Sequence, residues 1–212
     1  MNSTRQRLRI ALPKGRLYDP TVACFARAGV IVDPAPGRRL LVPSNDPSIE
    51  FLVVKPGDVA VYVESGAADL GVTGSDVLRE SDPDLLEPLE LGFGACRLVV
   101  ANRATDPWPE LPGGQTPRVA SKYPRLAWKH FAEQGKPVEI IQVHGSVEVA
   151  PLLGLAHWIV DLVDTGNTLR ANGLIERVTI LDVSAVLVAN RASQKLKLEA
   201  HLDASTPSTS PS

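Results

Sequence analysis

The chain has 212 residues, of which 44% are hydrophobic and 22% charged, the mixture expected of a globular protein with a substantial core. Its formal net charge of −2 argues against broad, non-specific binding of nucleic acid, which requires a basic surface. The N-terminus lacks the apolar segment of a secretory signal, and no apolar run is long enough to span a membrane, so we expect a cytoplasmic protein.

The two cysteines, Cys24 and Cys96, both lie in apolar stretches. We therefore expect two buried free thiols in a reducing compartment. Cysteines and histidines do not cluster at the spacing of zinc ligands, so the sequence predicts no metal site held by the protein alone.

Short apolar strands alternate with helical stretches through the first half of the chain. Asp19 is expected to cap a helix whose first turn contains Pro20, because proline is favoured at that position. The expected strands cover residues 8–12, 49–54 and 69–72, and the expected helices cover residues 19–29, 56–66 and a segment that starts at 74–76.

The same alternation restarts after residue 115. The expected strands cover residues 118–120, 138–143 and 158–163, with one or two more in 178–188, and the expected helices cover residues 124–134, 146 to about 153, and 166–172. Trp128 and Trp158 fall within these periodic patterns and are predicted to be core residues.

Two halves of this kind predict an α/β protein with two lobes and mostly parallel sheets. We expect the first lobe to contain residues 1–92 and about 178–200, and the second to contain residues 93–177. Residues 203–212 have almost no apolar content and are expected to form a disordered tail. Because ligands bind at the carboxyl ends of parallel strands, where several glycine-containing turns fall, we expect an interlobe cleft.

The most informative segment is DLVDTGNTLR at residues 161–170, an apolar strand that ends in a small-residue turn before a helix. Free N–H groups and the helix dipole make such a turn a cradle for an anion, and the hydroxyls of Thr165 and Thr168 add donors. The carboxylates of Asp161 and Asp164 suit sugar hydroxyls or a divalent cation. A phosphorylated ribose offers all of these groups, although Asp164 or Thr165 can also serve as a plain helix cap.

Five motifs, in order and in register, resemble the short form of the ATP phosphoribosyltransferase family over nearly the whole chain. They are ALPKGRL at residues 11–17, KPGDVAVYV at 55–63, GAADLGVTGSDV at 66–77, GSVEVA at 145–150 and DLVDTGNTLRANG at 161–173. The resemblance implies two lobes like those of type II periplasmic binding proteins. It also implies transfer of the phosphoribosyl group from phosphoribosyl pyrophosphate (PRPP) to N1 of ATP, the first step of histidine biosynthesis.

The resemblance further implies a regulatory partner. The long form of the family carries an extra C-terminal domain, for which this chain is too short. We therefore expect a histidyl-tRNA-synthetase-like subunit in a histidine-sensing hetero-oligomer, a hetero-octamer. Mg²⁺ is expected to arrive with the substrates, held largely by their phosphates.

By this resemblance, Arg16 and Arg38 are the expected catalytic residues, which stabilise the departing pyrophosphate. The predicted PRPP site consists of Asp161, Asp164, Thr165, Gly166, Asn167 and Thr168. Further substrate contacts are expected at Lys14, Gly15, Lys55, Thr73, Gly74 and Glu148. Simpler roles stay open for three of these residues: a solvated loop charge for Arg38, a surface lysine for Lys55 and a helix-dipole carboxylate for Glu148.

Two other functions stay open at this point, because a fold does not fix a function. One is a cytoplasmic module that binds or senses a small ligand, and the other is a different nucleotide-dependent transferase with the same phosphate cradle. Turnover separates the first of these from the expected enzyme, since a sensor leaves its ligand unchanged.

Overall fold

The computed structural model describes residues 7–33 and 40–192, which fold into two compact units. The first unit contains the described residues up to Gly94 together with residues 184–192, and the second is Ala95–Val183. The chain therefore returns to the first unit at Ser184, not near residue 178 as expected. Residues 178–183 stay in the second unit because they belong to a strand that pairs with Cys96–Arg103. The expected tail at 203–212 lies outside the described residues.

The first unit contains a six-stranded sheet in the order β2-β3-β1-β4-β11-β5. Its strands are β1 (Leu8–Pro13), β2 (Leu41–Pro43), β3 (Ile49–Val54), β4 (Leu70–Gly74), β5 (Leu86–Glu90) and β11 (Ala185–Ala189). The central strands β3, β1 and β4 are parallel, whereas β2, β11 and β5 pair antiparallel to their neighbours. The sheet is thus mixed, because the chain returns from the second unit as β11 and runs against β4.

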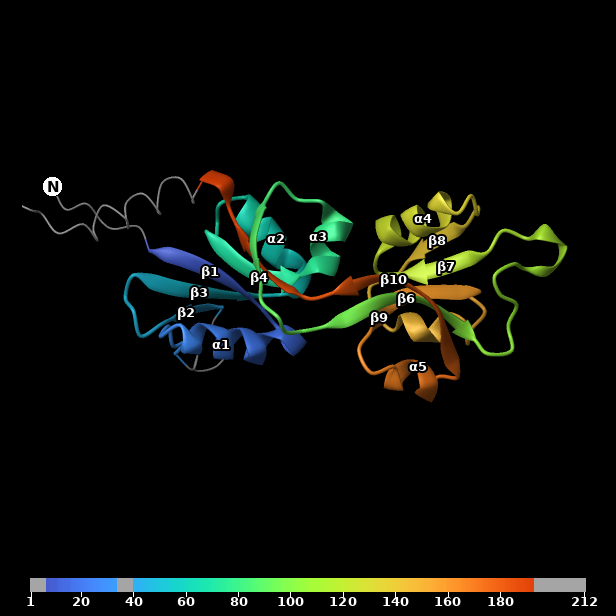
Figure 1. Ribbon diagram of the computed structural model, residues 1–212, viewed down its shortest axis with the longest axis horizontal. Helices are drawn as coiled ribbons and strands as arrows, with labels where there is room; N and C mark the ends of the chain where they lie inside the picture. The colour runs from blue at the N-terminus through green and yellow to red at the C-terminus, as the bar shows by residue number, and fades with distance from the viewer. Residues whose placement is uncertain (1–6, 34–39, 193–212) are drawn as a thin grey trace, which may run out of the picture. The chain divides into compact units, whose positions relative to one another are not determined.

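Helices cover both faces of this sheet, with α1 on one face and α2 and α3 on the other (Figure 1). The helical segments are η1 (Gly15–Leu17), α1 (Tyr18–Arg27), α2 (Pro56–Glu64) and α3 (Ser75–Ser81). Asp19 was expected to cap α1 but lies in its first turn, because the short η1 turn already starts the helical path and Leu17 takes the capping position.

The second unit contains a five-stranded sheet in the order β10-β6-β9-β7-β8. Its strands are β6 (Cys96–Arg103), β7 (Arg118–Ser121), β8 (Glu139–Gln142), β9 (Trp158–Val163) and β10 (Leu174–Val183). β9, β7 and β8 are parallel, whereas β6 runs antiparallel to both β9 and β10. The carboxyl ends of the parallel strands β9, β7 and β8 therefore lie at one edge of the sheet. The start of the antiparallel strand β6 lies at the same edge, beside the end of β9.

Helix α4 (Pro124–Glu133) lies on one face of this sheet and α5 (Asn167–Ala171) on the other (Figure 1). Two short 3-10 turns complete the unit, η2 (Pro112–Gly114) and η3 (Val147–Val149). The expected helix from 146 to about 153 is wrong beyond η3: residues 150–154 form turns. Pro151 and Gly154 explain this, since proline lacks the N–H that continues a helix and glycine disfavours it.

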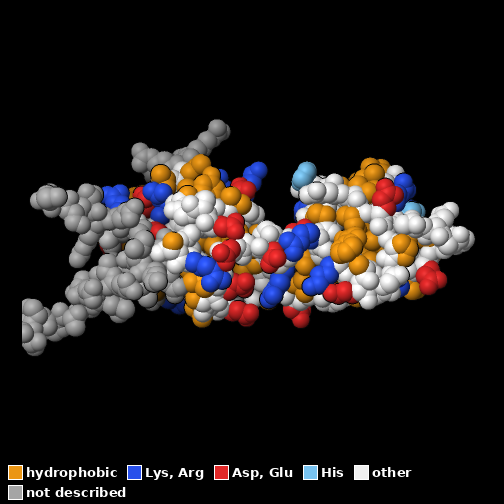
Figure 2. All heavy atoms as spheres, turned by 90° about the horizontal axis from the view of Figure 1, so that it is seen from above, with side chains coloured by type: hydrophobic (Ala, Val, Ile, Leu, Met, Phe, Trp, Pro, Cys, Tyr) orange, Lys and Arg blue, Asp and Glu red, His pale blue; other side chains and the backbone are white. Residues whose placement is uncertain are grey.

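The aromatic core of the second unit is centred on Trp158, which is 1% exposed. Its ring packs edge-on against Trp108 and is stacked with Phe131 at centroid distances of 4.8 and 5.5 Å. The prediction for Trp158 is confirmed, but that for Trp128 is wrong, because this side chain is 61% exposed on α4. Hydrophobic side chains do show among polar ones on the surface of the second unit in Figure 2.

Cys24 and Cys96 are free thiols as expected, but each is only half-buried. Within residues 7–33 and 40–192, none of the helices is both long and apolar enough to cross a membrane.

Gly71 lies in β4 and faces two valines of α2. A Cβ atom added there would come within 2.6 Å of a Val59 methyl and 2.8 Å of a Val63 methyl. Both valines are fully buried on α2, so neither can move aside without disturbing the core. Glycine is therefore required at this position for packing, since its φ is not in the left-handed region.

We expect Gly71→Ala to lower the free energy of unfolding by about 1–3 kcal/mol, the usual cost of forcing an extra methyl into a packed core. Urea denaturation followed by circular dichroism measures the loss. Gly57→Ala is the matched control, because Gly57 lies in the first turn of the same helix with open space around its Cα. A loss in Gly57→Ala as large as that in Gly71→Ala would contradict the packing argument.

Candidate active site

The predicted site residues of the first unit gather where three parallel strands end side by side. In the β1–β3 register Pro13 pairs with Val54, so Lys14 and Lys55 follow the two strands at the same level. The Lys14 N–H donates to the Val54 carbonyl at 2.7 Å and extends the pairing by one bond. Both lysine side chains are exposed, so this edge carries two solvent-exposed ammonium groups.

Arg16 follows a sharp turn at Gly15, whose φ of 77° favours glycine. The Arg16 side chain is exposed, and its Nη1 donates to the Gly94 carbonyl at 3.3 Å. Arg38, the other expected catalytic arginine, lies outside the described residues.

The turn between β4 and α3 is more enclosed than expected. Thr73 is fully buried and its hydroxyl donates to the Pro56 carbonyl at 3.1 Å. That hydroxyl therefore ties the start of α2 to the end of β4 and is not presented to a ligand. Gly74 is required for space, because a Cβ there would overlap the buried carboxylate of Asp76.

In the second unit, Glu148 lies close enough to Asp161 to influence the charge of that carboxyl. Burial raises the pKa of Asp161 above its ordinary value, and nearby Glu148 raises it further. Lys122 and the Leu162 N–H oppose this pKa shift. Lys122 follows β7, and its Nζ lies 3.4 Å from Oδ1 of Asp161, with the two side chains 40% and 17% exposed. The carboxylate is thus held by a lysine that sequence reasoning missed.

The loop that joins β9 to α5 carries the remaining predicted residues. Asp164, Thr165, Asn167 and Thr168 are exposed, while Gly166 is buried in the left-handed conformation with a φ of 77°. The Thr165 hydroxyl accepts the Asn167 N–H at 3.5 Å, so the turn is closed by its own side chain. The exposed side chains of the loop therefore lie directly beside the N–H groups of the first turn of α5.

Two arginines that sequence reasoning missed hold this loop. Arg97 at the start of β6 donates Nη1 to the Asp164 carbonyl at 3.1 Å. Arg170 in α5 donates Nη2 to the Thr165 carbonyl at 3.0 Å and to Oδ1 of Asn167 at 2.6 Å. Arg170 lies in the quoted motif and was within reach of sequence reasoning, whereas Arg97 is separated from Asp164 by 67 positions and shares no local pattern with it.

The model of the family described as HisG, ATP phosphoribosyltransferase, matches residues 55–206, which include this loop and the strand ends after β3 and β4. The chain belongs to the ATP phosphoribosyltransferase family. A relative from Sorangium cellulosum (strain So ce56), named ATP phosphoribosyltransferase, is 52% identical over 192 residues, which is 90% of this chain and 89% of the relative. Membership in this family makes the chain a pentosyltransferase.

Solved structures agree on the fold. The ATP phosphoribosyltransferase in the complex described as HisG:HisZ, from Thermotoga maritima, is 32% identical to this chain, with a TM-score of 0.79 and coverage of 92% of this chain and 94% of that one. A histidine kinase sensor domain with similarity to periplasmic binding proteins matches at a TM-score of 0.55 and 12% identity, over 90% of this chain and 85% of that one. This second likeness supports the expected two-lobed α/β architecture only.

We expect Lys122→Met to raise the pKa of Asp161 beyond its value in the unchanged protein, because it removes the cation that opposes burial. Carbon-detected NMR titration of the Asp161 carboxyl measures the shift. Lys129→Met is the control, since Lys129 pairs with Glu133 on the exposed face of α4. An unchanged Asp161 titration in Lys122→Met would contradict the pairing.

The same variant has a predicted dependence on pH. With a folded pKa raised above the unfolded one, the folded state binds the proton more tightly, so stability falls as pH rises through that interval. Lys122→Met should therefore lose stability relative to the unchanged protein at about pH 7 and regain it near pH 3, where the carboxyl is protonated. A loss of equal size at both pH values would show that the lysine acts through packing and not charge.

Proposed function

We propose that the chain transfers the phosphoribosyl group of PRPP to N1 of ATP, which yields N1-(5-phosphoribosyl)-ATP and releases pyrophosphate. This is the first step of histidine biosynthesis. The observation that carries the proposal is the Asp164–Thr168 loop in a chain of this family: a buried left-handed glycine surrounded by exposed threonines and a carboxylate at the end of a parallel strand. A cytoplasmic location fits a biosynthetic enzyme of this kind.

The loop from Asp164 to Thr168 is the proposed site for the ribose 5′-phosphate. Hydroxyls of Thr165 and Thr168 and the amides that open α5 supply donors for a dianion, and the positive end of the helix dipole favours it. The exposed carboxylate of Asp164 then accepts hydrogen bonds from the ribose hydroxyls. Asp161 and Glu148 are proposed as further acceptors at the same edge, with Asp161 paired to Lys122.

The basic residues of the first unit are proposed to bind the pyrophosphate. Displacement at C1 of the ribose passes through a cationic, oxocarbenium-like state while negative charge grows on the leaving oxygen. Guanidinium and ammonium groups aimed at that oxygen stabilise the transition state more than the ground state. Arg16 carries most of this task in our account, with Lys14, Lys55 and Arg38 as further cations and the Gly15 and Gly74 turns as close backbone approaches.

The attacking N1 of adenine already carries a lone pair, so the reaction needs no strong general base. Rate is then gained chiefly by holding N1 and C1 in line, as expected when positioning replaces proton transfer. This agrees with a set of site residues that is rich in cations, hydroxyls and backbone amides.

Mg²⁺ fits the residues of the phosphate loop. Among the described residues no group of three or more His, Cys, Asp or Glu side chains could hold a metal ion unaided. Mg²⁺ is commonly bound by one or two carboxylates together with substrate phosphates, and Asp164 offers an exposed carboxylate for this. When bound, the ion neutralises charge on the pyrophosphate.

A regulatory subunit is part of the proposal. The similar structure from Thermotoga maritima is of a HisG:HisZ complex. By analogy we propose that this chain assembles with a histidyl-tRNA-synthetase-like subunit in a hetero-oligomer.

A pair of variants separates leaving-group stabilisation from substrate binding. We expect Arg16→Ala to lower kcat by about 10²–10³-fold, as when one charge-stabilising donor is removed, with a smaller effect on PRPP affinity. Thr165→Ala should weaken PRPP binding by about tenfold and change kcat less, because a phosphate contact persists throughout the reaction. Pyrophosphate release, measured with the regulatory subunit present, gives kcat and KM, and calorimetry gives affinity.

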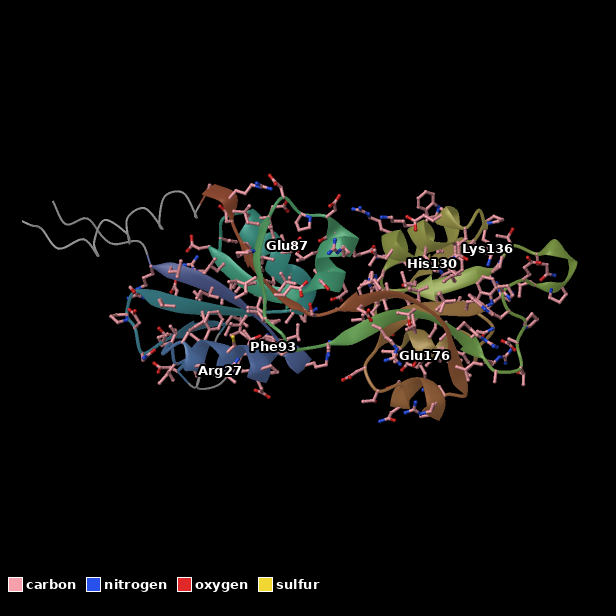
Figure 3. All side chains as sticks on the ribbon, viewed as in Figure 1. Arg27, Glu87, Phe93, His130, Lys136 and Glu176 are labelled. Carbon is pink, nitrogen blue, oxygen red and sulfur yellow. The ribbon has the colours of Figure 1, made fainter. Side chains whose placement is uncertain are left out.

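The control for these variants is Arg27→Ala, an exposed arginine at the end of α1 in the same unit as Arg16. Figure 3 labels Arg27 beside α1. Unchanged turnover in Arg16→Ala would remove this residue from the mechanism. Release of pyrophosphate without ATP, or binding of PRPP with no turnover when ATP is added, would favour a different enzyme or a sensor.

A further inference from the structure

The loop between β9 and α5 lies on a layer of charged side chains that no local sequence motif predicts. The layer consists of Arg97 from β6, Glu176 from β10 and Arg170 from α5. Figure 3 labels Glu176 on the side of the second sheet on which α5 lies. A Cβ added at Gly166 would come within 3.1 Å of Oε1 of Glu176 and 3.0 Å of Nη1 of Arg170, so the loop lies directly on this layer.

Arg97 is oriented by a two-pronged ion pair with Glu176. Its Nε donates to Oε2 at 2.9 Å and its Nη2 donates to Oε1 at 2.6 Å. The two side chains are 34% and 30% exposed, so the pair is partly shielded from solvent. A fork of this geometry fixes the plane of the guanidinium, which a lysine in its place would not do.

The remaining edge of the Arg97 guanidinium reaches the loop. In the β6–β9 register Arg97 pairs with Val163, the last residue of β9, and its Nη1 donates to the carbonyl of the next residue, Asp164. Arg170 likewise donates its Nη2 to the next carbonyl along the chain, that of Thr165. Two consecutive carbonyls of the loop are therefore each bound to a cation.

These two bonds fix the direction of the amides on the other side of each peptide. The only cis peptide bond among the described residues is Trp108–Pro109, so the 164–165 and 165–166 peptides are trans. In a trans peptide the N–H points opposite to the C=O. The N–H groups of Thr165 and Gly166 thus point away from the arginines, and a cation on each carbonyl polarises the N–H as a donor.

We propose that Arg97 is a positioning residue for the phosphate loop, which acts through the Asp164 carbonyl and is itself held by Glu176. In this proposal Arg97 acts on the loop and not on the substrate, because its Nε and Nη2 donate to Glu176 and its Nη1 donates to the Asp164 carbonyl. The inference rests on the proposed function of this loop as the site of the PRPP 5′-phosphate. It explains why the loop can present amides outward before any ligand binds.

The test combines a measurement on the loop itself with one on the substrate. In Arg97→Met we expect lower ¹⁵N NMR order parameters for the Thr165 and Gly166 amides, because the loop loses the bond that holds it. We also expect a KM for PRPP that rises by about tenfold while kcat changes less than threefold. Arg97→Lys keeps a cation near the Asp164 carbonyl, so its KM for PRPP should lie between those of the unchanged protein and Arg97→Met. Glu176→Gln has the same shape as the native residue and is expected to act in the same direction, which guards against a misfolded Arg97→Met.

Arg103→Met is the matched control, because Arg103 ends the same strand and pairs with Asp106 at the surface, away from the loop. It should alter neither readout. Wild-type order parameters of the loop amides in Arg97→Met and Glu176→Gln would overturn the positioning role, and so would a fall in kcat with KM unchanged.

One further comparison separates this inference from the proposed function. If the loop amides become more mobile in Arg97→Met but PRPP affinity is unchanged, while Thr165→Ala does weaken PRPP binding, the positioning role alone is overturned. If neither Arg97→Met nor Thr165→Ala weakens PRPP binding, the loop is not the phosphate site, and the proposed function of the loop fails together with the inference.

Discussion

The register of the parallel strands is the constraint on which the candidate site depends. Pro13 lies opposite Val54 in one sheet and Ser121 lies opposite Val160 in the other. The residues that follow are therefore neighbours, which sets Lys14 beside Lys55 and Lys122 beside Asp161. A shift of one residue in either pairing would turn alternate side chains to the other face and separate these groups.

The antiparallel strands make a second, different contribution. β6 runs against β9, so its first residues meet the end of β9, where the loop that leads to α5 begins. An all-parallel sheet would bring the end of another strand to that place, and an arginine at a strand start could not lie beneath the loop. β10 then supplies Glu176, which neutralises Arg97 and limits the cost of holding a guanidinium at a half-buried position. Parallel pairing thus places the polar turns at one edge of each sheet. Antiparallel pairing places Arg97 beside one of these turns, the loop between β9 and α5.

Local signals in the sequence were enough to predict the elements that carry the site. The strand at 158–163 and the helix starts at Pro56 and Pro124 have the observed limits, because apolar patterning and proline act over a few residues. Contacts between distant residues could not be predicted: Arg97 and Glu176 are 79 positions apart, and each by itself is an ordinary surface charge. The exposure of Trp128 was not predicted, because the helical pattern shows that residue 128 lies in a helix but does not show which side of that helix packs against the sheet.

The central claim is that the Asp164–Thr168 loop binds the phosphoribosyl donor. Calorimetric titration of PRPP with Mg²⁺ into the isolated chain tests this most directly, because binding does not require the regulatory subunit to switch on turnover. Our account predicts saturable binding of one PRPP per chain. Absence of heat at millimolar PRPP, both alone and with the regulatory subunit added, would contradict it.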